Sequence, residues 1–259
     1  MRKIITGFIL AFCCSAWAGE YEDAQAAYDK KDYVKAMQLY KAAAAKGNVS
    51  ALFNIGAMYD HGEGVTQDLV EALRWYKKAA VLGDPDAQFN VGEMYDRGDG
   101  TVQDYEMAMH WYKMAAAQED ADAQYNIGYL YRHGQGVKQD FAEAMKWYKK
   151  SAAHGDADAQ GMVGVMYYRG MGIKKNYAEA FRWYMKAAEQ EHAISQYNLG
   201  LMFQYGNGVP KDIVRAYMWF SLAADQDDDA MESRDEMAAK MTSRQIATGK
   251  KLVAEWRQR

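Results

Sequence analysis

Few side chains in the sequence have the types and spacing that catalysis needs. A serine β-lactamase requires Ser-x-x-Lys, which sets a base one helical turn from the nucleophile, and no serine here has a lysine at that spacing. The five histidines are spread along the chain, and no two have the His-x-x-x-His spacing of a zinc site. We therefore expect no catalytic residues, no metal site and no cofactor, and we assign the histidines to surface or loop positions.

One acidic stretch approaches the spacing of a calcium-binding loop. Asp225, Asp227, Asp229 and Glu236 stand where such a loop places its first, second, third and last carboxylate ligands. However, Ala230 stands where the sharp bend of that loop requires glycine. The sequence instead predicts the solvated, acidic start of a helix.

The first 18 residues have the pattern of a secretory signal peptide. Two basic residues precede the apolar run Ile4–Phe12, and Ala16-Trp17-Ala18 offers a small-x-small cleavage site. The run is too short to span a membrane. We predict cleavage after Ala18 and a periplasmic or secreted protein. A lipid-anchored alternative stays open, since the residues before Cys13 loosely resemble a lipobox.

Cysteine usage and charge exclude several classes of protein. Cys13 and Cys14 are the two cysteines, and both lie in the predicted signal peptide, so the mature chain would have no disulfide and no thiolate site. The formal net charge is −4, and removal of the two basic residues at the start would make the chain more acidic. This charge gives no reason to expect nucleic acid as a partner.

A repeat of 36 residues organises the rest of the chain. Five other positions, mostly glycine, tyrosine and alanine, keep the same step as five of the tryptophans. These tryptophans are Trp75, Trp111, Trp147, Trp183 and Trp219. The pattern predicts a shortened unit at 19–46, five full units at 47–82, 83–118, 119–154, 155–190 and 191–226, and capping helices at 227–259. Atypical ends with polar outer faces are expected of such a stack.

Each full unit should contain two helices. In the second unit Asp84 is suited to cap the first helix and Pro85 to begin it. That helix should reach about Tyr95, and Gly98 can take the left-handed conformation that ends it. The second helix should open at Asp104, and in three other units a glutamate stands where it would complete a capping box: Glu71, Glu143 and Glu179.

The helix signatures resemble those of a known repeat family. Leu/Ile-Gly-x-x-Tyr in the first helix resembles a tetratricopeptide unit, and the Gly-x-Gly-Val turn with Ala-x-x-Trp-Tyr-x-x-Ala-Ala is similar to the Sel-one-like repeats. The resemblance implies an all-α, right-handed α-solenoid of antiparallel helix pairs with tetratricopeptide-like, 36-residue repeats, usually an adaptor that holds other proteins. The shortened unit at 19–46 would be a degenerate tetratricopeptide-like unit. Some cysteine-rich relatives have been described as binding or hydrolysing β-lactams, but this chain lacks their cysteines.

Helical periodicity separates a packing face from a variable face. In the second helix, Trp75 and Tyr76 with Ala79 and Ala80 should fill the layer between units, because buried aromatic rings stabilise a core strongly. The opposite face of the first helix would line the concave groove implied by the resemblance, and there the residues change from unit to unit. Tyrosine and arginine are common interface anchors. The predicted partner-binding groove residues are Glu93, Arg97, Tyr129, Arg132, His133, Tyr168, Arg169 and Tyr205.

The sequence therefore predicts a non-enzymatic scaffold or adaptor of the bacterial cell envelope. It would bind a protein or peptide partner in the concave groove, as a monomer without a membrane span. The alternative is an envelope hydrolase acting on β-lactams or peptidoglycan.

Overall fold

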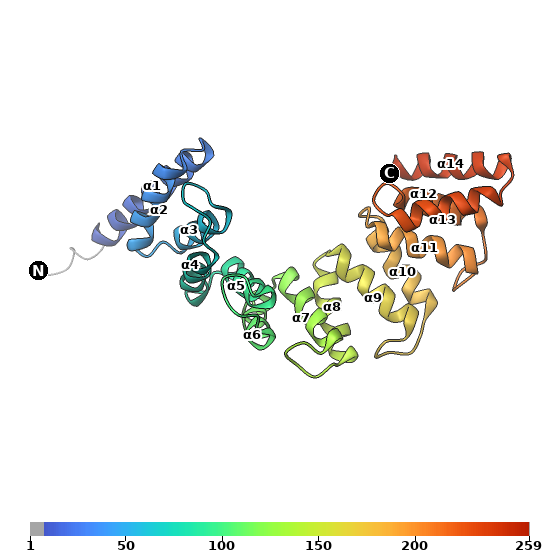
Figure 1. Cartoon of the computed structure of the whole chain (residues 1–259), viewed down its shortest axis with the longest axis horizontal. Coiled ribbons are helices and arrows are strands. Elements are labelled where there is room, and N and C mark those ends of the chain that lie inside the picture. The colour runs from blue at the N-terminus through green and yellow to red at the C-terminus, as the bar shows by residue number, and fades with distance from the viewer. Residues whose placement is uncertain (1–7, 259) are drawn as a thin grey trace, which may run out of the picture. The chain divides into compact units, whose positions relative to one another are not determined.

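The protein is built entirely from helices. A computed structural model describes residues 8–258, with side chains from Gly19 onward. These residues form fourteen α-helices and no strand (Figure 1). The chain divides into two compact units, Met1–Ala123 and Gln124–Arg259. The predicted all-α repeat fold is thus confirmed.

Unit 1 holds the first six helices and the beginning of the seventh. In chain order they are α1 (Phe8–Asp29), α2 (Tyr33–Ala45), α3 (Val49–His61), α4 (Leu69–Val81), α5 (Pro85–Arg97), α6 (Tyr105–Ala116) and the first residues of α7 (Ala121–His133). The closest packing joins α1 with α2, α3 with α4, and α5 with α6. Successive helices therefore form pairs, as the repeat predicts.

Unit 2 contains most of α7 and the remaining helices. They are α8 (Phe141–Ala153), α9 (Ala157–Arg169), α10 (Tyr177–Ala188), α11 (Ala193–Tyr205), α12 (Ile213–Ala223), α13 (Asp228–Ala239) and α14 (Ser243–Arg257). Here α9 pairs with α10 and α11 with α12, while α13 and α14 both pack on α12. We call the first and second helices of a pair helix A and helix B.

The predicted signal peptide lies largely outside the described residues. The structure describes no residue before Phe8, and from there to Ala18 it describes only backbone, the beginning of α1. Within the described part of the chain, no helix has both the length and the hydropathy that crossing a membrane requires.

Helix α5 shows how the local sequence sets the helix ends. The Asp84 carboxylate accepts a hydrogen bond from the backbone N–H of Ala87 at 2.8 Å, and Pro85 is the first helical residue. The helix runs to Arg97, two residues past the predicted end, because the left-handed residue that stops it is Gly98, with φ 82°. The predicted cap Asp104 is confirmed as well, and the same repeat position caps the other B helices: Asp68, Asp140, Asn176 and Asp212.

The three predicted capping boxes are only half formed. Each cap accepts from the backbone N–H of the glutamate, but the glutamate carboxylate then pairs with a cation three residues further on: Glu71 with Arg74, Glu143 with Lys146, and Glu179 with Arg182. The backbone N–H of each of these caps donates instead to a carbonyl of the preceding helix A, that of Tyr59, Tyr131 or Tyr167. A complete box forms at Thr242 and Gln245, where the cap N–H donates to the glutamine side chain.

A glycine of helix A lies against a buried ring of helix B in every full unit. A Cβ atom on Gly92 would lie 2.6 Å from the Cδ1 atom of Tyr112, so a larger residue would push the two helices apart. The five rings in these contacts are 2% exposed or less: Tyr76, Tyr112, Tyr148, Tyr184 and Phe220. In each repeat the ring that this glycine meets belongs to the residue after the tryptophan.

The second glycine of the Gly-x-Gly turn packs against the preceding helix pair. The sequence alone does not predict this contact. Gly100 has φ 67°, and a Cβ there would lie 2.3 Å from the carbonyl oxygen of Leu69, the first residue of α4. Only glycine fits both the left-handed backbone and this contact. The turn thereby ties one helix pair to the previous one.

The tryptophans lie between helix pairs, but not all of them are core residues. Trp111 and Trp219 are buried, whereas the other three are half-buried, each with a lysine over its ring: Trp75 with Lys78, Trp147 with Lys150 and Trp183 with Lys186. Trp75 packs against the cluster formed by α1, α2 and α3. The prediction that these rings fill the layer between units is confirmed, while full burial holds for two of the five.

The last two helices cover the end of unit 2. Asp227 caps α13, whose first residues are acidic, as predicted for this stretch. On α14, Leu252 and Val253 pack against the core cluster of α11 and α12, and the ring centroids of Trp219 and Trp256 are 4.7 Å apart. These contacts remove from solvent the apolar surface that a further repeat would otherwise cover.

Candidate functional site

The eight predicted groove residues all lie in the last turns of A helices. Glu93 and Arg97 are on α5 in unit 1. The other six are in unit 2, on α7, α9 and α11: Tyr129, Arg132, His133, Tyr168, Arg169 and Tyr205. Because α9 and α11 contact each other directly, Arg169 and Tyr205 belong to neighbouring helices.

In unit 1, Glu93 and Arg97 form an ion pair across one helical turn. Burial raises the pKa of the Glu93 carboxyl, and the Arg97 guanidinium opposes that shift. The Arg97 side chain is 65% exposed, so solvent screens the pair, and such pairs contribute only about 0.3–0.5 kcal/mol. The guanidinium is therefore free to exchange this partner for another carboxylate.

In unit 2, Tyr129 and His133 form an aromatic platform on α7. Their ring centroids are 4.0 Å apart, and both residues are exposed. His133 Nδ1 lies 2.9 Å from the carbonyl oxygen of Tyr129, and since a carbonyl only accepts, Nδ1 carries the proton. Nε2 of the neutral ring is then an acceptor, so the platform can both stack and hydrogen-bond.

Arg132 carries a positive charge at a repeat position that is acidic in unit 1. Its repeat position is that of Asp60 and Asp96, whose carboxylates accept from the hydroxyls of Tyr76 and Tyr112 at 3.4 and 3.3 Å. Arg132 is half-buried, its Nε has no hydrogen-bond partner among the described residues, and no ion pair with it is present there. The guanidinium also lies close enough to the Tyr148 hydroxyl to oppose the rise that burial causes in the pKa of that tyrosine.

The structure ties Tyr168 into the fold more than a recognition residue requires. Its hydroxyl accepts from Asn207 Nδ2 at 2.7 Å, and its ring packs on Tyr177 with 5.0 Å between centroids. By contrast, Arg169 is exposed and Tyr205 is 64% exposed. The most accessible of the predicted residues on α9 and α11 are therefore Arg169 and Tyr205.

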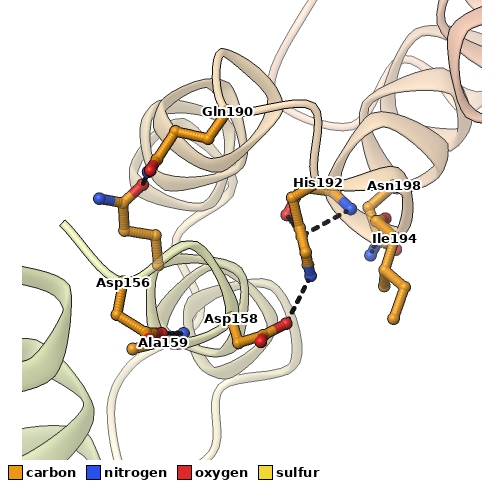
Figure 2. A network of polar contacts seen from close by, with 9 residues as sticks. Asp156, Asp158, Ala159, Gln190, His192, Ile194 and Asn198 are labelled. Carbon is orange, nitrogen blue, oxygen red and sulfur yellow. Dashed lines mark hydrogen bonds and ion pairs between the residues drawn. The ribbon is translucent and has the colours of Figure 1, made fainter. Parts of the chain in front are cut away.

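A second polar cluster, which sequence reasoning missed, joins α9 to the start of α11 (Figure 2). His192 Nδ1 lies 2.7 Å from Ser195 Oγ, and His192 Nε2 lies 3.0 Å from Asp158 Oδ1. These are the side-chain types of a serine hydrolase triad. His192 lies in the loop before α11, as predicted for the histidines, but it is half-buried and caps that helix.

The geometry of this cluster is that of a helix cap. Ser195 is 0% exposed, so its hydroxyl offers no path for a substrate. His192 Nδ1 also accepts from the backbone N–H of Ser195 at 3.3 Å, which fixes the ring as an N-cap. The cluster is best described as a link between two A helices.

The signal for this cluster was a set of coincident departures from the repeat. His192 and Ser195 stand where the repeat at 83–118 has Asp84 and Ala87. Gly161 stands at a repeat position that is aromatic in the other full repeats. A Cβ on Gly161 would lie 2.8 Å from His192 Cε1. The missing ring thus makes room for the histidine.

The acidic stretch with calcium-like spacing is used differently. Asp227 caps α13, and Asp225 Oδ2 accepts from Arg257 Nη2 at 2.7 Å. Among the residues with described side chains, no three His, Cys, Asp or Glu side chains are grouped closely enough to hold a metal ion.

Comparison with known proteins shows which repeat proteins the chain is similar to. The profile of the Sel1 repeat matches residues 17–48, 49–84, 85–120, 121–156, 157–192 and 193–228. A Sel1 repeat protein from Oxalobacter formigenes, known from its crystal structure, is 34% identical, with 80% of this chain and 85% of that chain covered and a TM-score of 0.76.

Two further relatives are less similar. The protective antigen c5321 of uropathogenic Escherichia coli, which has an SLR fold, is 27% identical over 93% of this chain and 68% of that one, with a TM-score of 0.45. The ERAD-associated E3 ubiquitin-protein ligase component HRD3 of Candida glabrata is 51% identical over 41 residues, which are 16% of this chain and 5% of that protein. With its helix pairs, its glycine contacts and six matched repeats over most of its length, the chain belongs to the Sel1 repeat family.

Proposed function

We propose that this protein is a non-enzymatic scaffold of the bacterial cell envelope that holds a protein or peptide segment on the faces of its A helices. Sel1 repeat proteins generally act as protein-interaction scaffolds. The observation that carries the proposal is the exposed platform of Tyr129 and His133, beside an arginine that has no ion pair among the described residues.

The chemistry of this surface indicates the partner. In unit 2, Arg132 and Arg169 have no paired carboxylate among the described residues, while Tyr129 and Tyr205 present rings to solvent. Arginine binds carboxylates through two parallel hydrogen bonds, and aromatic rings supply contact area at low entropic cost. A segment that carries carboxylates beside apolar or aromatic side chains fits this surface.

Site-specific photocrosslinking tests the proposal. A photoreactive residue is placed at Tyr129, at Tyr205 or, as a control, at Lys146 on the exposed face of helix B. We expect one discrete adduct from both A-helix positions and none from Lys146. Adducts that form equally from all three positions would contradict binding on the A-helix face.

The hydrolase alternative makes a separate prediction. The purified mature protein should not turn over nitrocefin or muropeptides, because the serine of the Asp158–His192–Ser195 cluster is fully buried. Turnover that disappears in Ser195→Ala would overturn the scaffold proposal.

The proposed location rests on the amino-terminal sequence. Export with cleavage after Ala18 predicts a periplasmic or secreted protein whose mature chain starts at Gly19. Mass spectrometry of the mature protein tests this cleavage. We also expect the protein to be a monomer, which light scattering measures. A lipid-modified amino terminus at Cys13 would show the anchored form instead.

A further inference from the structure

The end of unit 2 contains a hollow of about 630 Å³ that is separate from the A-helix face. It is bounded by the turn between α10 and α11, the end of α12 and the end of α14. The lining residues used below are Glu189, Glu191, Gln196, Asp225, Trp256 and Arg257.

The hollow carries an excess of negative charge and already accommodates a guanidinium. Arg257 Nη2 lies 2.7 Å from Asp225 Oδ2. Glu189 and Glu191 line the same hollow and form no ion pair with any described residue. The site therefore has charge for one more cation.

A glutamine in the hollow lacks the donor that two of its three counterparts have. Gln88 and Gln160 each accept a side-chain hydrogen bond, from Gln118 at 2.9 Å and from Gln190 at 3.0 Å. Gln196 holds the same repeat position and is 3% exposed, and its Nε2 donates to the carbonyl of Ala188 at 3.3 Å. No donor among the described residues bonds to its Oε1.

The donor is absent although its residue is present. Gln226 stands where Gln118 and Gln190 stand, lines the same hollow, and makes no side-chain hydrogen bond to Gln196. A link that closes two other repeats is thus open in the last one, as it also is at Gln124. Because Gln196 lines the hollow, an N–H donor that enters it can bond to this oxygen.

The turn beside this acceptor is also changed. Glu191 occupies the repeat position of Gly83 and Gly155 and keeps their left-handed backbone, with φ 61°. A side chain in this conformation is unfavourable compared with glycine. Glu191 thereby adds an acidic residue to the lining of the hollow.

An apolar hollow of about 270 Å³ lies next to the acidic one. Trp256 lines both. Arg215 and Glu255 also line this hollow, but most of its lining consists of rings and aliphatic side chains: Phe181, Met185, Phe203, Met218, Trp219 and Leu252. A bound segment could therefore place a cationic side chain on one side of the Trp256 indole and an apolar side chain on the other.

We propose that this end of unit 2 is a second docking site, which binds a protein segment carrying an arginine next to a large apolar residue. The arginine enters the acidic hollow, where its several N–H donors reach Gln196 Oε1 and the carboxylates of Glu189 and Glu191 together. The apolar side chain enters the hollow beside Trp219. Charge complementarity selects this occupant over the acidic segment proposed for the A-helix face.

A fluorescein-labelled peptide, Gly-Gly-Arg-Phe-Gly-Gly, tests the site by fluorescence polarisation with the full mature chain. We expect the peptide with Gln in place of Arg to bind about tenfold more weakly, because charge-assisted hydrogen bonds are lost. The peptide with Ala in place of Phe should also bind more weakly. Equal binding of the Arg and Gln peptides would overturn the proposal.

Glu191→Gly and Glu119→Gly form a matched pair of variants. Both residues have a left-handed backbone, with φ 61° and 68°, and hold the same repeat position, but only Glu191 lines the hollow. Both variants should melt at the same or a slightly higher temperature than the wild type, since glycine relieves the backbone. Only Glu191→Gly should weaken peptide binding, by about two- to fivefold. Equal effects of the two variants on binding would contradict the assignment.

Discussion

Helices α5 and α11 hold the same place in their repeats but begin with different chemistry. Both end at a left-handed glycine, Gly98 with φ 82° and Gly206 with φ 77°. However, α5 is capped by the carboxylate of Asp84, and α11 by the imidazole of His192. The difference shows that the repeat fixes which positions cap a helix or contact a neighbouring one. The side chains at these positions can differ between repeats when their neighbours differ as well.

The core behind the two helices is the same, and removing it should have the largest effect. Tyr112 packs on α5 and Phe220 on α11, each against a helix-A glycine. Tyr112→Ala and Phe220→Ala should each lower the free energy of unfolding by about 3–5 kcal/mol, through lost burial and the cavity left behind. Urea unfolding followed by circular dichroism measures this, with the exposed Tyr205→Ala as control. A Phe220→Ala variant as stable as that control would show that the cores are not equivalent.

The two caps should differ in strength. Asp84→Ala removes one cap and should cost about 1 kcal/mol. His192→Ala removes a cap and the contact with Asp158, and leaves the buried Ser195 hydroxyl without its partner, so it should cost about 2 kcal/mol. The same unfolding experiment compares them. If His192→Ala costs less than Asp84→Ala, the cluster is not a structural link.

The smallest effect is expected on the face of α5. Burial raises the pKa of the Asp96 carboxyl, against the lowering effects of the Tyr112 hydroxyl and Arg97. The charged form is thus disfavoured in the folded state, so Asp96→Asn should stabilise the protein at neutral pH, by less than about 1 kcal/mol because solvent screens this half-buried group.

The gain from Asp96→Asn should disappear in acid. The folded wild type takes up its proton at a higher pH than the unfolded chain does, so its relative stability rises as the pH falls through the raised pKa. Unfolding curves from pH 7 downward measure this difference. A gain that persists when Asp96 is protonated would point to a cause other than charge.

Much of the fold follows from the sequence because its determinants are local or strictly periodic. Asp84, Pro85 and Gly98 specify the ends of α5 within a few residues, and the 36-residue step identifies the glycine that meets a helix-B ring. The sequence does not show which ring the glycine meets, because Trp75 and Tyr76 are adjacent aromatic residues. In the structure only the tyrosine is buried.

The functional surfaces were less predictable, since they depend on side chains far apart in sequence. Tyr168 fits the pattern of a recognition residue, yet it is held by Asn207, 39 residues away. Nor does the sequence around Gln196 show that its acceptor lacks a donor, because that depends on where Gln226 points. What the sequence does offer is the departure from the repeat, and departures that occur together, as at Gly161, His192 and Ser195, mark such places.

The central claim is that repeated positions hold the stack and unrepeated A-helix positions bind the partner. The most direct test combines Tyr129→Ala, His133→Ala and Arg169→Ala in one variant, and compares it with a helix-B control carrying Lys146→Ala and Arg182→Ala. Melting temperature is measured together with crosslinking of the partner from Tyr205. We predict that both variants melt like the wild type and that only the A-helix variant loses the adduct. An A-helix variant that melts normally and still forms the adduct would contradict the account.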